Sequence, residues 1–217
     1  MKALFLLVGV SWLLMTEVAV AIDPVSPFED PILETTYQEL IKDIIEHPDQ
    51  AWLYQPNMDY GGDDDTLEVQ YSQFLIGIHG TDAPGHFQLF HALFGLMGKI
   101  VDELLPNYQP TRIRGILQTP TPNAAKFYLP HTDGGHEDGY SLIYYPSDAT
   151  GDTYLFREMF NNPPENTRRQ YHWNPIDSVT PKQGRLIMFP AHQYHAGSSP
   201  NSKRRMLINF NFDTKYN

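Results

Sequence analysis

The chain has 217 residues, no cysteine, a formal net charge of −11 and a pI near 5.1. This length fits one domain with a sizeable core. Without cysteine the chain forms no disulfide, zinc–thiolate site, iron–sulfur cluster or cysteine nucleophile, so any metal must be held by His, Asp or Glu. The acidic balance argues against a general affinity for nucleic acid, because phosphate binding needs a basic surface.

The first residues admit two interpretations. A basic residue, the apolar run 3–15 and Ala19-Val20-Ala21 have the pattern of a secretory signal peptide over residues 1–21, which would make the protein secreted or periplasmic. Alternatively Met15 starts translation, or the N-terminus is retained because residues 17–23 alternate like a strand, and the protein is cytoplasmic. The apolar run is too short for a comfortable membrane span, so no stable span is expected.

The N-terminal half is predicted to be largely helical. Over residues 31–47 apolar side chains recur every three or four positions, as on an amphipathic helix. A second helix is predicted to reach residue 105, because Asp82-Ala83-Pro84 places an N-cap before a first-turn proline. Between them, residues 67–78 have the composition of a strand. We expect the helices of residues 31–105 to cover one sheet of the remaining domain.

From residue 112 onward the chain changes to short apolar or alternating runs separated by Pro, Gly, Asn and Asp. Strands are predicted at 112–119, 125–129, 140–145, 153–156, 171–172, 185–189 and 204–213. Many short strands at this spacing indicate a β-sandwich or barrel, and the architecture we expect is a jelly roll. No repeat or linker appears, so we predict a mainly β fold with supporting helices, one domain over 22–217 with its jelly-roll core at 112–213.

A His-x-Asp pair, His131 and Asp133, lies near the start of this core. At the end of a strand, residues i and i+2 point to the same face, so the imidazole and the carboxylate would converge. A second imidazole from His195 or His192 would complete two histidines and one carboxylate, the ligand set of non-haem Fe(II) oxygenases. The alternative is a turn with a solvated histidine.

The last predicted strand alternates strictly between an apolar and a mostly polar face. The polar face carries Arg205, Leu207, Asn209 and Asn211. By default such a face lies in water. The functional interpretation places Arg205 at the floor of a polar pocket, where a guanidinium binds a carboxylate bidentately. Arg204 takes this place if the register is shifted by one residue.

These motifs, taken in order, resemble the 2-oxoglutarate- and Fe(II)-dependent dioxygenases, in particular the prolyl-4-hydroxylase-like branch with its small bacterial and phage members. The resemblance covers about residues 112–213. It is carried by His131-x-Asp133, Ile143-Tyr144-Tyr145, Gly184 followed by Phe189-Pro190, then His195 and Arg205.

The resemblance implies a double-stranded β-helix with Fe(II) held by His131, Asp133 and His195. His195 is preferred to His192 because family members place the distal ligand five residues after the Phe-Pro pair. Arg205 and Tyr145 would bind the far carboxylate of 2-oxoglutarate, and ascorbate is a further cofactor of some relatives. Many relatives have a small hydroxyl residue at the position of Leu207, so the chain departs from the pattern there.

The implied activity is hydroxylation of a C–H bond with O2 and 2-oxoglutarate, releasing succinate and CO2. The substrate would be a protein side chain or a small metabolite, and nucleic acid is disfavoured by the acidic surface. A cupin-like metal-binding jelly roll without oxygenase activity is the alternative; it would keep the three metal ligands but have no use for Arg205. A structural jelly-roll module is a third interpretation, in which these polar residues are incidental.

Overall fold

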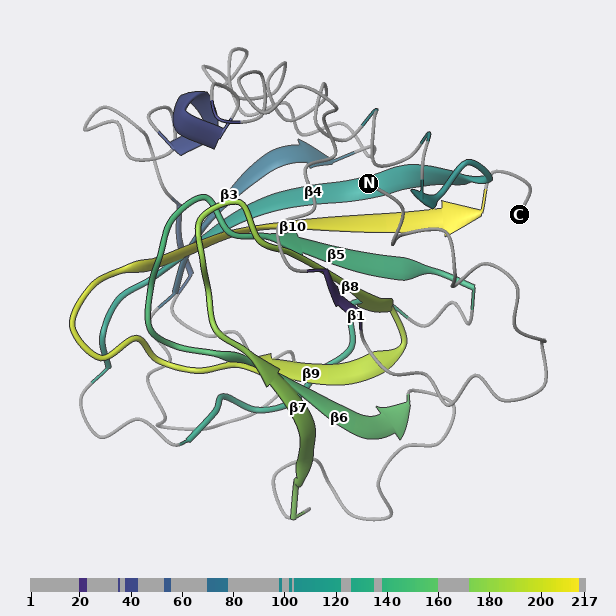
Figure 1. The fold of residues 1–217 in the computed structure, drawn as a ribbon. Helices are drawn as coiled ribbons and strands as arrows, with labels where there is room; N and C mark the ends of the chain where they lie inside the picture. Colours follow the sequence, from purple (N-terminus) through teal and green to yellow (C-terminus); the bar gives the residue numbers. More distant parts are fainter. Residues whose placement is uncertain are drawn as a thin grey trace, which may run out of the picture.

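In the part of the chain that the structure describes, ten strands form two antiparallel sheets that face each other (Figure 1). This computed structural model describes residues 20–22, 35, 38–42, 53–55, 70–77, 98, 102, 104–121, 126–134, 138–159 and 172–214. The strands are β1 (Val20–Ile22), β2 (Leu53–Gln55), β3 (Gln70–Gly77), β4 (Tyr108–Gln118), β5 (Tyr140–Tyr144), β6 (Thr153–Met159), β7 (Pro175–Val179), β8 (Leu186–Pro190), β9 (Gln193–Gly197) and β10 (Arg205–Thr214).

The strand order is that of a jelly roll. The larger sheet has the order β1-β8-β5-β10-β4-β3-β2, and the smaller sheet has the order β7-β6-β9. From β5 onward the chain crosses from one sheet to the other at β5 to β6, β7 to β8, β8 to β9 and β9 to β10 (Figure 1). Strands that follow one another in the sequence therefore alternate between the two sheets at these four connections. The predicted mainly β jelly roll is confirmed.

A core of apolar side chains fills the space between the two sheets. Because successive residues of a strand point to opposite faces, each strand contributes every second residue to this interior. The buried cluster consists of Ile116, Ile143, Tyr145, Leu155, Val179, Ile187, Phe189 and Leu207. Leu207 belongs to the cluster, which identifies the Arg205–Asn211 face of β10 as the inward one. The opposite face of β10 is also buried, at Met206, Ile208, Phe210 and Phe212.

Several predicted strands form with boundaries shifted by a few residues, and two do not form as predicted. Residues 126–129 are not a strand, and the pairing near them is an isolated bridge at His131. His172 lies outside any strand, because the edge strand β7 begins three residues later, at Pro175. β9 was not predicted at all, although it carries His195.

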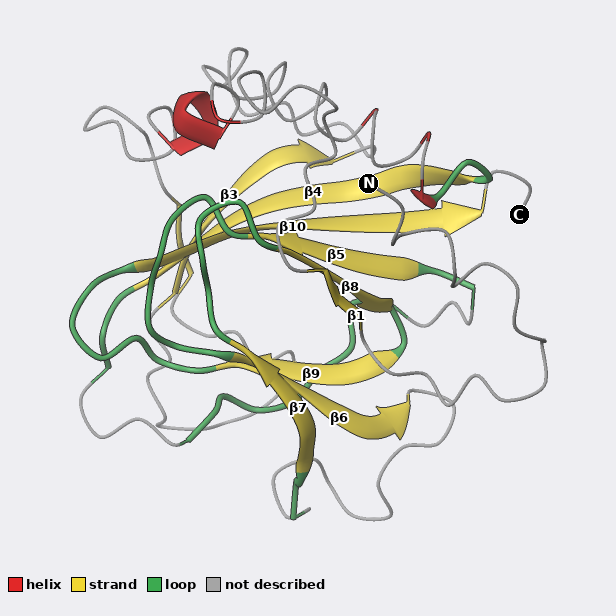
Figure 2. Ribbon diagram, viewed as in Figure 1, coloured by secondary structure: helices red, strands yellow, loops and turns green. Residues whose placement is uncertain are grey.

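The predicted helices lie mostly outside the described residues. Of the segment 31–47, Thr35 and residues 38–42 are helical, and of the segment ending at 105, Gly98, Asp102 and Leu104 are helical (Figure 2). The helical support therefore stays a prediction. No helix among the described residues combines the length and hydropathy that a membrane crossing needs.

The alternating segment near the N-terminus contributes a strand. Val20 pairs with Met188 and Ile22 with Leu186, which makes β1 the edge of the larger sheet beside β8. Loss of residues 1–21 would remove two of the three residues of β1.

Candidate functional site

His131 and His195 are joined through their backbones. The N–H of His131 donates to the carbonyl of His195 at 3.0 Å, and the N–H of His195 donates to the carbonyl of His131 at 2.9 Å. This bridge brings the two imidazole rings to a centroid separation of 4.5 Å, although 64 residues separate them in the sequence. His195 itself is fixed within β9, where it pairs with Leu155 of β6.

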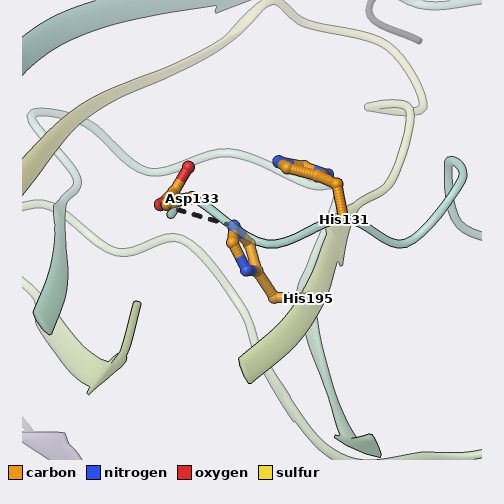
Figure 3. Close-up of side chains that lie close together, drawn as sticks. All are labelled: His131, Asp133 and His195. Atoms are coloured by element: carbon orange, nitrogen blue, oxygen red, sulfur yellow. Dashed lines mark ion pairs between the residues drawn. The ribbon is translucent and has the colours of Figure 1, made fainter. Parts of the chain in front are cut away.

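Asp133 reaches the same point from a loop. Its backbone N–H donates to the carbonyl of Ala191 at 3.0 Å, which holds the loop against the turn between β8 and β9. Its Oδ2 lies 3.6 Å from Nε2 of His195 (Figure 3). One ligand atom from each of His131, Asp133 and His195 lies within 4.8 Å of the other two. His192 is buried but is not a member of this cluster.

The environment sets the protonation states of these groups. Burial, and after it the neighbouring His195, lower the pKa of His131 to about 3. Burial alone would raise the pKa of Asp133, but the surrounding histidines and arginines outweigh it and hold this pKa well below its usual range. His131 is therefore neutral and Asp133 ionised at neutral pH, the forms in which these side chains bind metal ions.

The tautomer of His195 is also defined. Its Nδ1 lies 3.1 Å from the backbone carbonyl of Gln193, which only accepts, so Nδ1 carries the proton. In the neutral ring Nε2 is then the nitrogen with the lone pair, and it lies 3.6 Å from Oδ2 of Asp133. A second ring nitrogen bonded to a carbonyl is the usual arrangement around metal-binding histidines. Two imidazole nitrogens and one carboxylate, all on one side, fit a divalent transition metal such as Fe(II).

Asp133 is surrounded by hydrogen-bond donors that sequence analysis did not identify as parts of the site. Its Oδ2 accepts from Oγ of Ser141 at 2.7 Å and from Nδ2 of Asn209 at 2.9 Å. Its Oδ1 accepts from Nη2 of Arg112 at 3.2 Å. The alternating sequence of β10 places Asn209 on the polar face of the strand. The sequence alone did not show whether this face turns toward the interior or toward solvent.

Arg205 lies inside the same barrel and is almost completely buried, at 1% exposure, whereas Arg204 is exposed. Its Nη1 donates to Oε1 of Gln118 at 2.5 Å, and its Nη2 donates to Oγ1 of Thr153 at 2.6 Å. Both acceptors are neutral, and no described carboxylate forms an ion pair with this guanidinium. The Nε of Arg205 is buried without a hydrogen-bond partner among the described residues.

Tyr145 lies beside this guanidinium. Its hydroxyl is 2.6 Å from Oγ1 of Thr153, and the guanidinium carbon of Arg205 lies 5.8 Å from the centre of its ring. Burial raises the pKa of Tyr145, so the hydroxyl keeps its proton and can donate it. The inward face of the barrel thus holds a buried cation bonded only to neutral groups, where an anionic ligand would find charge-assisted donors.

No protein-family model and no curated protein sequence matches the chain. Solved structures do match. A 2OG-Fe(II) oxygenase family oxidoreductase from Burkholderia pseudomallei aligns with a TM-score of 0.58 and 11% identity over 90% of this chain and 85% of its own. SnoN, a non-heme alpha ketoglutarate dependent epimerase from nogalamycin biosynthesis, aligns with a TM-score of 0.61 and 11% identity over 91% of this chain and 79% of its own.

A third match is the prolyl hydroxylase of Trichoplax adhaerens in complex with a hypoxia inducible factor peptide, with a TM-score of 0.50 and 14% identity over 92% of this chain and 85% of its own. The chain has the fold of the 2OG-Fe(II) oxygenases. At these identities the likeness establishes the double-stranded β-helix, and the chemistry has to be argued from the side chains.

Proposed function

We propose that the chain is a 2-oxoglutarate- and Fe(II)-dependent dioxygenase. The observation that carries the proposal is the convergence of His131, Asp133 and His195, from two remote parts of the sequence, within 4.8 Å of one another. In this proposal His131, Asp133 and His195 hold Fe(II) on one side. When bound there, Fe(II) supplies the redox chemistry that allows O2 to oxidise a C–H bond.

Arg205 is proposed to bind the far carboxylate of 2-oxoglutarate. A buried guanidinium whose hydrogen-bond acceptors are the neutral Gln118 and Thr153 is costly, and an anionic ligand beside it would lower that cost. A carboxylate would compensate the charge and accept the hydrogen bond from Nε that no described residue accepts. Gln118 and Thr153 keep the guanidinium in one orientation, and the Tyr145 hydroxyl is a further donor. A fixed anchor of this kind orients the co-substrate in the barrel.

The overall reaction replaces a substrate C–H bond by C–OH. One oxygen atom of O2 enters the hydroxyl group and the other enters succinate, while 2-oxoglutarate loses CO2. The protein's part is to position the C–H bond and to keep water away from the reacting groups. The substrate is proposed to be a protein side chain, as for a prolyl hydroxylase, or a small metabolite. The proteins of similar fold include one of each kind, a prolyl hydroxylase in complex with a peptide and an epimerase from nogalamycin biosynthesis.

Release of succinate tests this proposal. Purified protein with Fe(II), ascorbate and 2-oxoglutarate is screened against proline-containing peptides and small metabolites, in air and under nitrogen. We expect that at least one of these two substrate classes raises the oxygen-dependent rate of succinate release above the rate without substrate. A protein that binds Fe(II) but forms no succinate with any class, and no uncoupled succinate without substrate, would instead support the cupin-like alternative.

Gly197 is predicted to leave room for the Arg205 guanidinium because it has no side chain. A Cβ added at Gly197 would lie 3.1 Å from Nη1 of Arg205 and 3.5 Å from Nε2 of Gln118. Gly197→Ala should therefore displace the guanidinium and weaken 2-oxoglutarate binding by roughly fivefold, which corresponds to the low end, about 1 kcal/mol, of what overpacking costs. Calorimetric titration of the Mn(II)-loaded protein measures this, with Gly98→Ala as control, because an added Cβ there meets nothing within 4 Å. An unchanged affinity in Gly197→Ala would contradict the assignment.

A further inference from the structure

Four side chains around the candidate site close a ring of hydrogen bonds. Arg112 Nη2 donates to Asp133 Oδ1 at 3.2 Å, and Arg112 Nε donates to Asn211 Oδ1 at 2.8 Å. Asn211 Nδ2 donates to Ser141 Oγ at 3.0 Å, and Ser141 Oγ donates to Asp133 Oδ2 at 2.7 Å. The ring thus begins at one oxygen of the Asp133 carboxylate and returns to the other.

The sheet register brings these residues together. Asn211 of β10 pairs directly with Arg112 of β4 on one side and with Ser141 of β5 on the other. Directly paired residues on the same face of a sheet have neighbouring side chains. The Asn211 amide of the central strand β10 therefore bonds to side chains of both neighbouring strands, β4 and β5. The Asp133 carboxylate accepts hydrogen bonds from residues of all three strands.

Every hydrogen bond in the ring has a fixed direction. An arginine only donates and a carboxylate only accepts, so the amide oxygen of Asn211 must face Arg112 and its NH2 group must face Ser141. The Ser141 hydroxyl accepts a hydrogen bond from Asn211 and donates one to Asp133. A side chain at 211 without both a donor and an acceptor would leave Arg112 and Ser141 free to rotate away from the carboxylate.

We propose that Asn211 is a positioning residue that sets the direction of the Asp133 carboxylate toward His131 and His195. This inference rests on the proposed metal site, and it assigns a role there to a residue whose side chain bonds to Arg112 and Ser141 and not directly to a proposed metal ligand. Asn209, two residues before it on the same face, donates directly to Asp133 Oδ2 at 2.9 Å. Mutation of residues that orient a metal ligand from outside the metal site typically lowers metal affinity by about 10- to 100-fold.

Binding of Mn(II) to the metal-free protein, measured by calorimetry and by Mn(II) electron paramagnetic resonance, tests the proposal. Asn211→Leu has a similar volume and removes both the donor and the acceptor, and Ser141→Ala removes one hydroxyl. We expect each variant to bind Mn(II) about 10- to 100-fold more weakly than the natural protein. Their effects should overlap in the double variant, because either change opens the same ring. The Mn(II) spectrum of each variant should also change, which a purely structural role would not cause.

Thr111→Val is the matched control. The Thr111 hydroxyl donates to the backbone carbonyl of Asn211 at 3.2 Å and lies outside the ring, so its loss should leave Mn(II) affinity unchanged. Folded Asn211→Leu or Ser141→Ala protein with natural Mn(II) affinity overturns the inference while leaving the proposed function in place. If Asn211→Leu does not fold, Asn211→Ala, which also removes the donor and the acceptor, decides on the same criterion. A natural protein that binds neither Mn(II) nor Fe(II) overturns the proposed function and the inference together.

Discussion

His195→Ala is expected to abolish tight binding of Fe(II) and Mn(II) while the barrel stays folded. The strand pairing of His195 with β6 and its bridge to His131 are formed by backbone groups, and alanine keeps them. The imidazole Nε2 beside Asp133 is lost, and with it one of the three proposed metal ligands. The decrease in affinity should exceed the roughly 100-fold that loss of an outer partner reaches. Calorimetric titration with Mn(II) under nitrogen measures it.

His192→Ala is the control for this experiment. His192 lies three residues away and is also buried, but it is not part of the cluster. Its replacement should leave the metal affinity unchanged, whatever it does to the melting temperature. A large decrease of metal affinity in His192→Ala, together with an unchanged metal affinity in His195→Ala, would show that the distal ligand had been assigned to the wrong histidine.

Arg205→Met is expected to weaken 2-oxoglutarate binding strongly with little change in metal affinity. Methionine fills much of the buried volume but removes the charge and all its donors. Hydrogen bonds to charged groups contribute about 1.5–3 kcal/mol each, so loss of even one predicts roughly 10- to 150-fold weaker binding. Titration of 2-oxoglutarate into Mn(II)-loaded protein gives the value. Arg205→Lys should also bind poorly, because an ammonium group does not reproduce the guanidinium fork.

The neighbouring arginine supplies the comparison. Arg204 is exposed, so Arg204→Met should leave 2-oxoglutarate affinity unchanged. If Arg204→Met weakens binding as much as Arg205→Met does, the carboxylate is not held inside the barrel. If neither variant has an effect, 2-oxoglutarate is anchored elsewhere or is not a co-substrate.

The jelly roll was predictable from sequence because short strands separated by turn residues leave few other folds. β9 was missed for a physical reason. Its sequence Gln193-Tyr194-His195-Ala196-Gly197 has little β-branched or apolar content, and it pairs because the ends of β6 and the His131 segment lie beside it. β7 was displaced because its exposed edge residues, including Asp177 and Ser178, resemble a loop.

The geometry of the site was only partly predictable. The same-face argument for His131 and Asp133 assumed a strand end, whereas the described residues 126–129 form no strand and a single backbone bridge to His195 orients the segment. The solvent-facing default for the polar side of β10 is wrong, since Arg205 and Asn209 are 1% and 3% exposed. Alternation gives two faces, and only the tertiary fold decides which one turns inward.

The partners of Asp133 depend on registers between distant strands. Arg112 and Ser141 are unremarkable polar residues in the sequence, separated from Asn211 by 99 and 70 positions. Their proximity follows from the pairing of β4, β10 and β5, which a single sequence does not encode in any local pattern.

Visible absorption during anaerobic titration of 2-oxoglutarate into the Fe(II)-loaded protein tests the central claim most directly. We expect a weak charge-transfer band that saturates with 2-oxoglutarate, is absent in His195→Ala and requires far more co-substrate in Arg205→Met. Protein that retains Fe(II) but develops no band at millimolar 2-oxoglutarate, or a band that persists unchanged in both variants, would contradict the account.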